Sequence, residues 1–184
     1  MTIYRLRNRA TNWGDYGDVL VSGMTSHRGR QNDQLQLERT GPYVPPLINS
    51  GIGHIVITDI VKEKLKASDL SGITFKPVIK RHIVELNWTT WDLSTEEPPV
   101  YPDSGEPEDY ILAGQHSESV SEVMGNLWEL VLPTRGTFND KTFIDVDLQV
   151  DIFKADNRGY ILVTDKAKVW IEGNAADWVT FEKL

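Results

Sequence analysis

The sequence of 184 residues contains no cysteine. This absence excludes a disulfide scaffold, a thiolate metal site and a cysteine nucleophile. The sequence also lacks any apolar run approaching the ~18 residues that a helix needs to cross a bilayer. The first residues, Met1 to Arg7, do not contain the apolar stretch of a signal peptide. We therefore expect a cytoplasmic protein that has no membrane segment.

Familiar catalytic and cofactor-binding motifs are absent as well. The sequence has no GxxxxGKS/T or GxGxxG phosphate-binding loop, no HExxH and no GxSxG. The histidines are scattered, and none has helical or hairpin spacing to another ligand type: His27, His54, His82 and His116. We predict no bound metal, no cofactor and no enzymatic activity.

Positive charge is scarce in one long segment. The net charge is −8, and residues 92–109, called the acidic segment below, contain seven carboxylates and no Lys or Arg. Four prolines stiffen this segment and exclude it from sheet interiors. Phosphate contacts need clustered cations, so the acidic balance argues against nucleic-acid binding and permits a basic protein partner.

What the sequence does contain is an internal repeat. The stretch from Gly53 to Val78 aligns without a gap to residues 159–184, at a constant offset of 106 residues. In both copies a short apolar strand precedes Thr-Asp, two residues that favour a helix N-terminus. An amphipathic helix and a closing strand follow, with Ile60, Val61 and Leu65 predicted on the apolar face of the first helix. We predict a duplicated strand–helix–strand unit.

The remaining patterns predict further elements around the repeat. Residues 2–7 and 34–38 alternate as strands do, residues 8–34 are irregular, and residues 117–127 have helical periodicity after the cap Ser117. We predict an α+β fold with mostly antiparallel sheets, in a single domain over residues 1–184 that is built of two halves. The predicted parts are N-terminal strands and an irregular loop (1–52), the first repeat half (53–91), an acidic Pro-rich loop (92–116), and the second half with the second repeat (117–184).

Aromatic residues accompany the acidic segment. Trp88 and Trp91 precede it directly, and Tyr101 lies within it. Aromatic side chains are enriched at interface hot spots, although tryptophans also close the edges of cores and charge runs are usually solvated surface. We predict that one partner-binding surface contains Trp88, Trp91, Glu96, Glu97, Tyr101, Asp103, Glu106, Glu108 and Asp109.

The chain resembles small bacterial immunity proteins that protect against polymorphic toxins, and more closely an uncharacterised immunity-like group. The matching residues are Tyr4-Arg-Leu6, Ile55 to Asp59, Asp151-Ile-Phe153, and Ile161 to Lys168. Relatives of that group contain a doubled CxxCG motif that is thought to hold zinc, and this feature does not carry over to a chain without cysteine. The resemblance implies a cytoplasmic protein that binds one cognate toxin effector and neutralises it by direct contact. It implies no catalytic residue.

Two other functions are compatible with these residues. A small hydrolase, or an enzyme that reverses a toxin's modification, could use His116 with Glu106 or Glu108 as an acid/base pair. A structural or adaptor module without a toxin partner is the other alternative.

Overall fold

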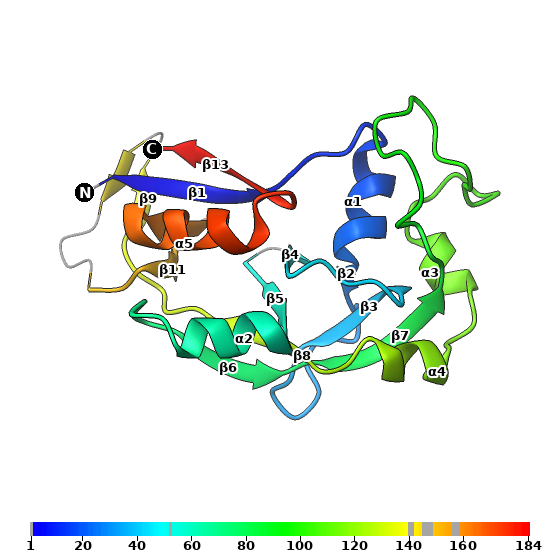
Figure 1. Ribbon diagram of the computed structural model, residues 1–184, viewed down its shortest axis with the longest axis horizontal. Coiled ribbons are helices and arrows are strands. Elements are labelled where there is room, and N and C mark those ends of the chain that lie inside the picture. The colour runs from blue at the N-terminus through cyan, green and yellow to red at the C-terminus, as the bar shows by residue number, and fades with distance from the viewer. Residues whose placement is uncertain (1, 52, 140–141, 145–148, 156–158) are drawn as a thin grey trace.

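Helices and mostly antiparallel sheets make up this computed structural model, which confirms the predicted α+β class (Figure 1). It describes residues 2–51, 53–139, 142–144, 149–155 and 159–184. The elements, in chain order, are β1 (Ile3–Asn8), α1 (Gly14–Ser22), β2 (Met24–Thr25), β3 (Gln36–Gly41), β4 (Leu47–Asn49), β5 (Ile55–Thr58), α2 (Asp59–Lys66), β6 (Thr74–Pro77), β7 (Ile79–Glu85), α3 (Asp109–Ala113), α4 (Glu118–Val123), β8 (Leu127–Val131), β9 (Thr137–Asn139), β10 (Thr142–Ile144), β11 (Ile152–Lys154), β12 (Ile161–Thr164), α5 (Asp165–Ala175) and β13 (Val179–Lys183).

Two four-stranded sheets have the same arrangement of strands. Their orders are β4-β5-β8-β6 and β11-β12-β1-β13, so each repeat helix connects two strands that flank one central strand. Leu130 of the central strand β8 lies opposite Ile55 and Phe75. Leu6 of the central strand β1 likewise lies opposite Ile161 and Phe181, which are 106 positions after Ile55 and Phe75. The two segments therefore share topology and register, as the repeat predicted, while a duplication as their origin stays a prediction.

The central strand of each sheet comes from outside the repeat unit. β1, from the N-terminal part, completes the sheet of the second unit, and β8, from the part that follows the acidic segment, completes the sheet of the first. The flanking strands are both antiparallel to the central one and hence parallel to each other, which leaves room for one strand between them. The predicted division into 53–91 and 117–184 therefore does not separate the two sheets.

The two repeat helices share one core. Val61 and Leu65 of α2 are buried together with Ala167 and Ile171 of α5, in a cluster that includes side chains of both four-stranded sheets. In Figure 1, α5 and α2 lie between the strand pair β1–β13 and the strand pair β6–β8. A strand–helix–strand unit has an apolar helix face that it cannot bury alone, and the two units bury theirs against each other. Ile60, predicted on this face, is instead 71 % exposed.

A third sheet, of order β2-β3-β7, covers the sheet of the first unit. β3 is buried along its whole length and pairs with β7 in parallel, an exception to the antiparallel pattern. Leu37 of β3 and Ile83 of β7 pack with Val56 of β5 and Ile48 of β4 in a second buried cluster. This packing buries the face of the first sheet that points away from α2.

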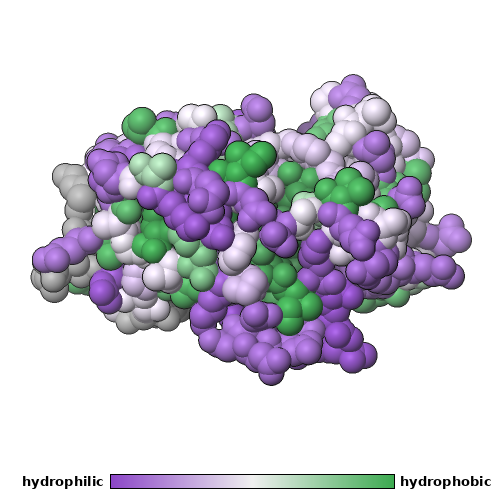
Figure 2. All heavy atoms as spheres, turned by 60° about the horizontal axis from the view of Figure 1, so that its bottom comes forward, coloured by the Kyte–Doolittle hydropathy of each residue, from purple (hydrophilic) through white to green (hydrophobic). Residues whose placement is uncertain are grey.

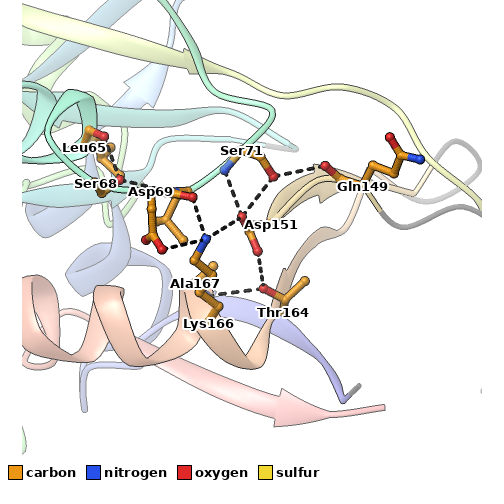
Figure 3. Close-up of polar contacts among 10 residues, drawn as sticks. Leu65, Ser68, Asp69, Ser71, Gln149, Asp151, Thr164, Lys166 and Ala167 are labelled. Atoms are coloured by element: carbon orange, nitrogen blue, oxygen red, sulfur yellow. Dashed lines mark hydrogen bonds and ion pairs between the residues drawn. The ribbon is translucent and has the colours of Figure 1, made fainter.

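A network of polar contacts joins the two repeat units (Figure 3). The Asp151 carboxylate accepts hydrogen bonds from the backbone N–H and hydroxyl of Ser71, at 2.8 and 2.9 Å, and from the Thr164 hydroxyl at 2.9 Å. The Lys166 Nζ atom lies 3.1 Å from an Asp69 carboxylate oxygen and 3.8 Å from Asp151. Burial opposes ionisation of Asp151, but these donors outweigh it and lower the pKa of the carboxyl group. Asp151 therefore links the segment after α2 to the start of α5.

The aspartates that follow the repeat threonines do not cap their helices. The caps are the threonines, and each aspartate is the first residue of its helix. Asp59 accepts a 2.5 Å hydrogen bond from the indole of Trp128 on β8, and Asp165 accepts a 3.1 Å bond from the hydroxyl of Tyr4 on β1. Trp128 and Tyr4 occupy equivalent positions on the central strands. Both aspartates thus have the same role, which is to connect the helix start to the central strand by a hydrogen bond.

Residues 14–22 form helix α1, where the sequence had predicted an irregular loop. Glycine and aspartate obscured the pattern, but Tyr16, Leu20 and Val21 are buried on one side. Gly17 is required by close packing, because a Cβ atom at that position would lie 1.6 Å from the Thr11 hydroxyl oxygen. The helix prediction for residues 117–127 was too long, since α4 ends at Val123 and a turn precedes β8.

The surface mixes polar and apolar side chains. On the face shown in Figure 2, hydrophilic residues cover the projecting lower part, and apolar residues form separate patches above it. Within the part of the chain that the structure describes, no helix is both long and apolar enough to cross a membrane.

Candidate partner-binding surface

The acidic segment is anchored to the start of α1. In Figure 1 it belongs to the green loop that runs beside α1 and on to α3. Three side chains of residues 12–16 donate hydrogen bonds to its main-chain carbonyls: Asn12 to Ser94 at 2.7 Å, Trp13 to Thr95 at 2.9 Å and Tyr16 to Val100 at 2.6 Å. The Tyr16 ring also lies 4.5 Å, centroid to centroid, from the ring of Tyr101. The segment is therefore held against the fold, although its prolines exclude it from the sheets.

The Tyr16 hydroxyl, which donates the hydrogen bond to Val100, has a raised pKa. Burial, with smaller contributions from Tyr110 and Tyr101, raises its pKa to about 12. The phenol therefore stays protonated near neutral pH and keeps its hydrogen bond to the segment. At the other end of the anchored stretch, the Asp92 carboxylate accepts from the hydroxyl and N–H of Ser94, at 2.6 and 2.9 Å, which lowers the pKa of Asp92.

The carboxylates of the segment have no cationic partner within the described ranges. Every ion pair found there, at N···O distances up to 4.0 Å, uses acidic residues from other parts of the chain. Glu96, Glu97, Asp103 and Glu106 are exposed, whereas Glu108 and Asp109 are half-buried at the start of α3. The acidic segment is thus a band of negative charge that the rest of the described protein does not neutralise.

Three hollows adjoin one another along the base of the acidic segment. The first, of about 480 Å³, is lined by Asn12, Trp13, Glu96, Glu97, Pro98 and Tyr101. The second, of about 250 Å³, shares Asn12 with the first and is also lined by Arg9, Leu93, Asp177 and Trp178. The third, of about 250 Å³ and called the aromatic pocket below, is lined by Tyr43, Trp88, Thr89, Trp91, Leu93 and Trp178.

The walls of the aromatic pocket pack against one another. The ring centroids of Tyr43 and Trp88 lie 5.4 Å apart at an interplanar angle of 87°, and those of Trp88 and Trp178 lie 5.9 Å apart at 75°. Trp91 contacts Trp13 edge to face at 6.1 Å, which connects this pocket to the first hollow. Edge-to-face pairs of this kind stabilise aromatic clusters by about 1 kcal/mol beyond burial.

A buried arginine organises the chain behind these rings. Arg39 is fully buried, and its guanidinium donates to the main-chain carbonyls of Thr40, Val21 and Tyr43, at 2.8, 3.2 and 3.0 Å. Burial lowers the pKa of Arg39 to about 9, so the group is still charged near neutral pH. Through these bonds Arg39 fixes the end of α1 and the main chain at Tyr43, which positions one wall of the pocket.

The structure brings together only part of the predicted binding surface. Glu96, Glu97 and Tyr101 line one hollow, and Tyr101 is 49 % exposed. Trp91 is half-buried and lines the aromatic pocket. The prediction of Trp88 as a surface contact was wrong, because Trp88 is only 2 % exposed and packs in the aromatic cluster.

Sequence reasoning missed several residues that line these hollows. Trp13 precedes the unrecognised helix α1, Tyr43 lies in a Pro-rich turn, and Asp177 and Trp178 lie between α5 and β13. The spacing of Trp13, Tyr16 and Leu20 is a helical signal that could have revealed the first of these. Nothing local in the sequence indicates that Tyr43 and Trp178 come into contact, at 5.8 Å between ring centroids.

The acid/base pair considered for a hydrolase is not formed among the described residues. The His116 Nδ1 atom accepts a 2.9 Å hydrogen bond from the backbone N–H of Ile83, and its Nε2 atom lies 3.1 Å from Glu118. His116 therefore contacts Glu118 rather than Glu106 or Glu108. A search over the residues that the structure covers found no group of three or more His, Asp or Glu side chains arranged to hold a metal ion.

No protein-family model matches the sequence, and no curated protein matches it significantly.

Proposed function

We propose that this protein is an immunity protein that binds a cognate bacterial toxin domain directly and blocks it. The resemblance to immunity proteins suggests the class of partner. The observation that carries the proposal is the acidic segment, whose seven carboxylates have no cationic partner among the described residues. We place the contact on this segment and on the hollows at its base.

The geometry supports binding of a basic partner in two ways. First, a band of unpaired negative charge attracts a positively charged surface and accelerates their association, an effect that falls with ionic strength. Second, the hydrogen bonds from Asn12, Trp13 and Tyr16 hold the segment before binding. A segment that is already ordered loses less conformational entropy on binding than a free loop does.

The direct test uses the toxin genes that neighbour the gene for this chain. Each candidate toxin is produced with and without this protein in one cell, and survival is measured. Binding kinetics of the purified pair are then measured at low and high salt. We expect protection by the wild-type protein and an association rate that falls as salt is raised. Absence of both protection and binding for every neighbouring toxin would refute the immunity function.

A charge-neutralised variant then tests the location of the contact. The variant combines Glu96→Gln, Glu97→Gln, Glu106→Gln, Glu108→Gln and Asp109→Asn. We expect its association rate to fall about tenfold or more at low salt, with a smaller change in dissociation rate. Unchanged association kinetics in a folded variant would place the interface elsewhere.

A second variant with the same net charge is the matched control. It combines Glu63→Gln, Asp69→Asn, Glu118→Gln, Glu122→Gln and Glu172→Gln, which lie outside the acidic segment. We expect association close to that of the wild type, because exposed ion pairs contribute little to stability and these residues lie away from the hollows. Equal slowing in both variants would show that only total charge matters.

A further inference from the structure

We propose that the aromatic pocket binds the guanidinium group of an arginine that the partner inserts beside the acidic segment. The inference rests on the proposed function for the source of the arginine. The selectivity of the pocket for a cation is testable without that partner. Its support comes from the rings that line the pocket, from the cations that occupy other rings of the protein, and from the surrounding charge.

The lining of the pocket suits a flat cation. Four of its six lining residues are Tyr43, Trp88, Trp91 and Trp178, and the others are Leu93 and Thr89. The face of an aromatic ring is negative and attracts cations, most strongly for tryptophan. Arginine is the preferred cation for such sites because its planar guanidinium stacks on rings and is less strongly hydrated than an ammonium group.

Other aromatic rings of this protein already have a cation of their own. The Arg5 guanidinium lies 3.5 Å from the ring centroid of Tyr160, and the Lys62 ammonium lies 3.1 Å from that of Trp128. Lys168 lies 5.4 Å from the rings of both Tyr4 and Phe181. Across the described ranges, no Lys or Arg is placed in this way over a ring of the aromatic pocket. Cations thus lie over rings on or beside the two four-stranded sheets, whereas the rings of the aromatic pocket contact one another and Trp13.

Acidic groups near the pocket favour a cationic occupant, whereas the charged Arg39 behind Tyr43 opposes one. Trp91 is followed directly by Asp92, the first carboxylate of the acidic segment. On the other side, Leu93 and Trp178 are shared with the second hollow, which exposed Asp177 also lines. The cation that lines the second hollow is Arg9, and its guanidinium donates a 2.8 Å hydrogen bond to the Ala176 carbonyl. A basic side chain that enters beside Trp91 therefore meets aromatic side chains and lies next to a hollow that Asp177 lines.

The test uses the peptide acetyl-Gly-Arg-Gly-amide as a probe, with citrulline and norleucine analogues as controls. Citrulline keeps the shape of arginine and removes its charge, whereas norleucine is apolar. Binding is followed by NMR through the indole N–H signals of the six tryptophans, assigned with single Trp→Phe variants. We expect the arginine peptide to shift the signals of the half-buried Trp91 and Trp178, and to bind at least about fivefold more tightly than either analogue.

Variants of the full chain locate the binding. We expect Trp91→Leu, which keeps an apolar wall and removes the ring, to weaken arginine-peptide binding about fivefold or more, and Trp91→Phe to retain most of it. Trp170→Leu, at a half-buried tryptophan of α5, is the control that should leave binding unchanged. Equal or tighter binding of the norleucine or citrulline peptide would overturn the inference, as would the absence of shifts at the pocket tryptophans.

The result of the peptide-binding test can be distinguished from the result of the toxin-protection test. Selective arginine binding in the absence of toxin protection would keep the pocket and reject the immunity function. Protection without selective arginine binding would keep the immunity function and reject the arginine site. If both hold, Trp91→Leu should accelerate dissociation of the toxin complex, whereas neutralising the acidic segment slows association.

Discussion

The two strand–helix–strand units share a register, yet opposite charges occupy equivalent positions on their central strands. Glu129 of β8 is 5 % exposed in its side chain and accepts hydrogen bonds from Arg30 at 2.8 and 2.5 Å, with His54 at 3.3 Å. Arg5 of β1, at the equivalent position, is 24 % exposed and stacks on Tyr160. His54 and Tyr160 are themselves 106 residues apart. The shared topology therefore brings equivalent positions together in both units, whereas the residue types at these positions, and so the contacts that they make, differ.

The helix starts of the two units differ in a similar way. Thr58 and Thr164 have almost the same backbone conformation, with φ and ψ of −78° and 164° in the first and −76° and 168° in the second. The Thr164 hydroxyl accepts from the Ala167 N–H at 3.3 Å and donates to Asp151. The Thr58 side chain makes no capping bond. The two threonines thus have the same backbone conformation but different hydrogen bonds. We expect Thr164 to stabilise its helix start more than Thr58 does, because the Thr164 hydroxyl also contacts Asp151 from another part of the chain.

The largest expected effect tests the contrast between the two central strands. Glu129→Gln removes a buried carboxylate from Arg30 and His54, so we expect the free energy of unfolding to fall by on the order of 3 kcal/mol. Arg5→Gln removes a more exposed ion pair and a ring contact, and we expect a loss of about 1 kcal/mol or less. Urea denaturation of both variants measures the two losses. Equal losses would show that burial does not distinguish these positions.

Acid should reduce the contribution of Glu129 in a defined pH range. Burial raises its pKa, but hydrogen bonds and charge from Arg30 and His54 outweigh burial and lower the pKa from 4.5 to about 2. Because the folded pKa is the lower one, the contribution is complete above 4.5 and disappears as the pH falls towards 2.

The measurement is the difference in unfolding free energy between wild type and Glu129→Gln as a function of pH. We expect this difference to be constant near neutral pH and to shrink as the pH falls below about 4.5. The Arg5→Gln variant, measured in parallel, separates this effect from general acid destabilisation. A difference that stays constant through this range would contradict the lowered pKa.

The smallest expected effect concerns the helix starts. Thr164→Val keeps the side-chain shape and removes the hydroxyl that caps α5 and bonds to Asp151, so we expect a loss of about 1–2 kcal/mol. Thr58→Val should cost only a few tenths of a kcal/mol, because its hydroxyl makes no cap bond. Thermal or urea unfolding compares the matched pair. A larger loss for Thr58→Val would reverse the assignment of the stronger cap.

Much of the local structure was predictable from the sequence. Apolar periodicity with the Thr-Asp pair located both repeat helices, and alternation located β1 and part of β3, because these signals arise within a few neighbouring residues. The helix α1 was missed because Gly14, Gly17 and two aspartates weaken its propensity, while buried Tyr16 and Leu20 stabilise it through tertiary packing. The acidic segment was visible as charge, but its anchoring by residues 12–16 was not.

By itself, the sequence determined the two equivalent strand–helix–strand units and the concentration of negative charge after Trp91. Only the tertiary structure decided that β1 completes the sheet of the second unit and β8 that of the first, that Trp88 is buried, and that Tyr43, Trp91 and Trp178 line one pocket. The physical reason is the range of the interactions. Strand and helix patterns reflect burial repeated over two to four residues, whereas these contacts join residues far apart in sequence, whose meeting depends on how the whole core packs.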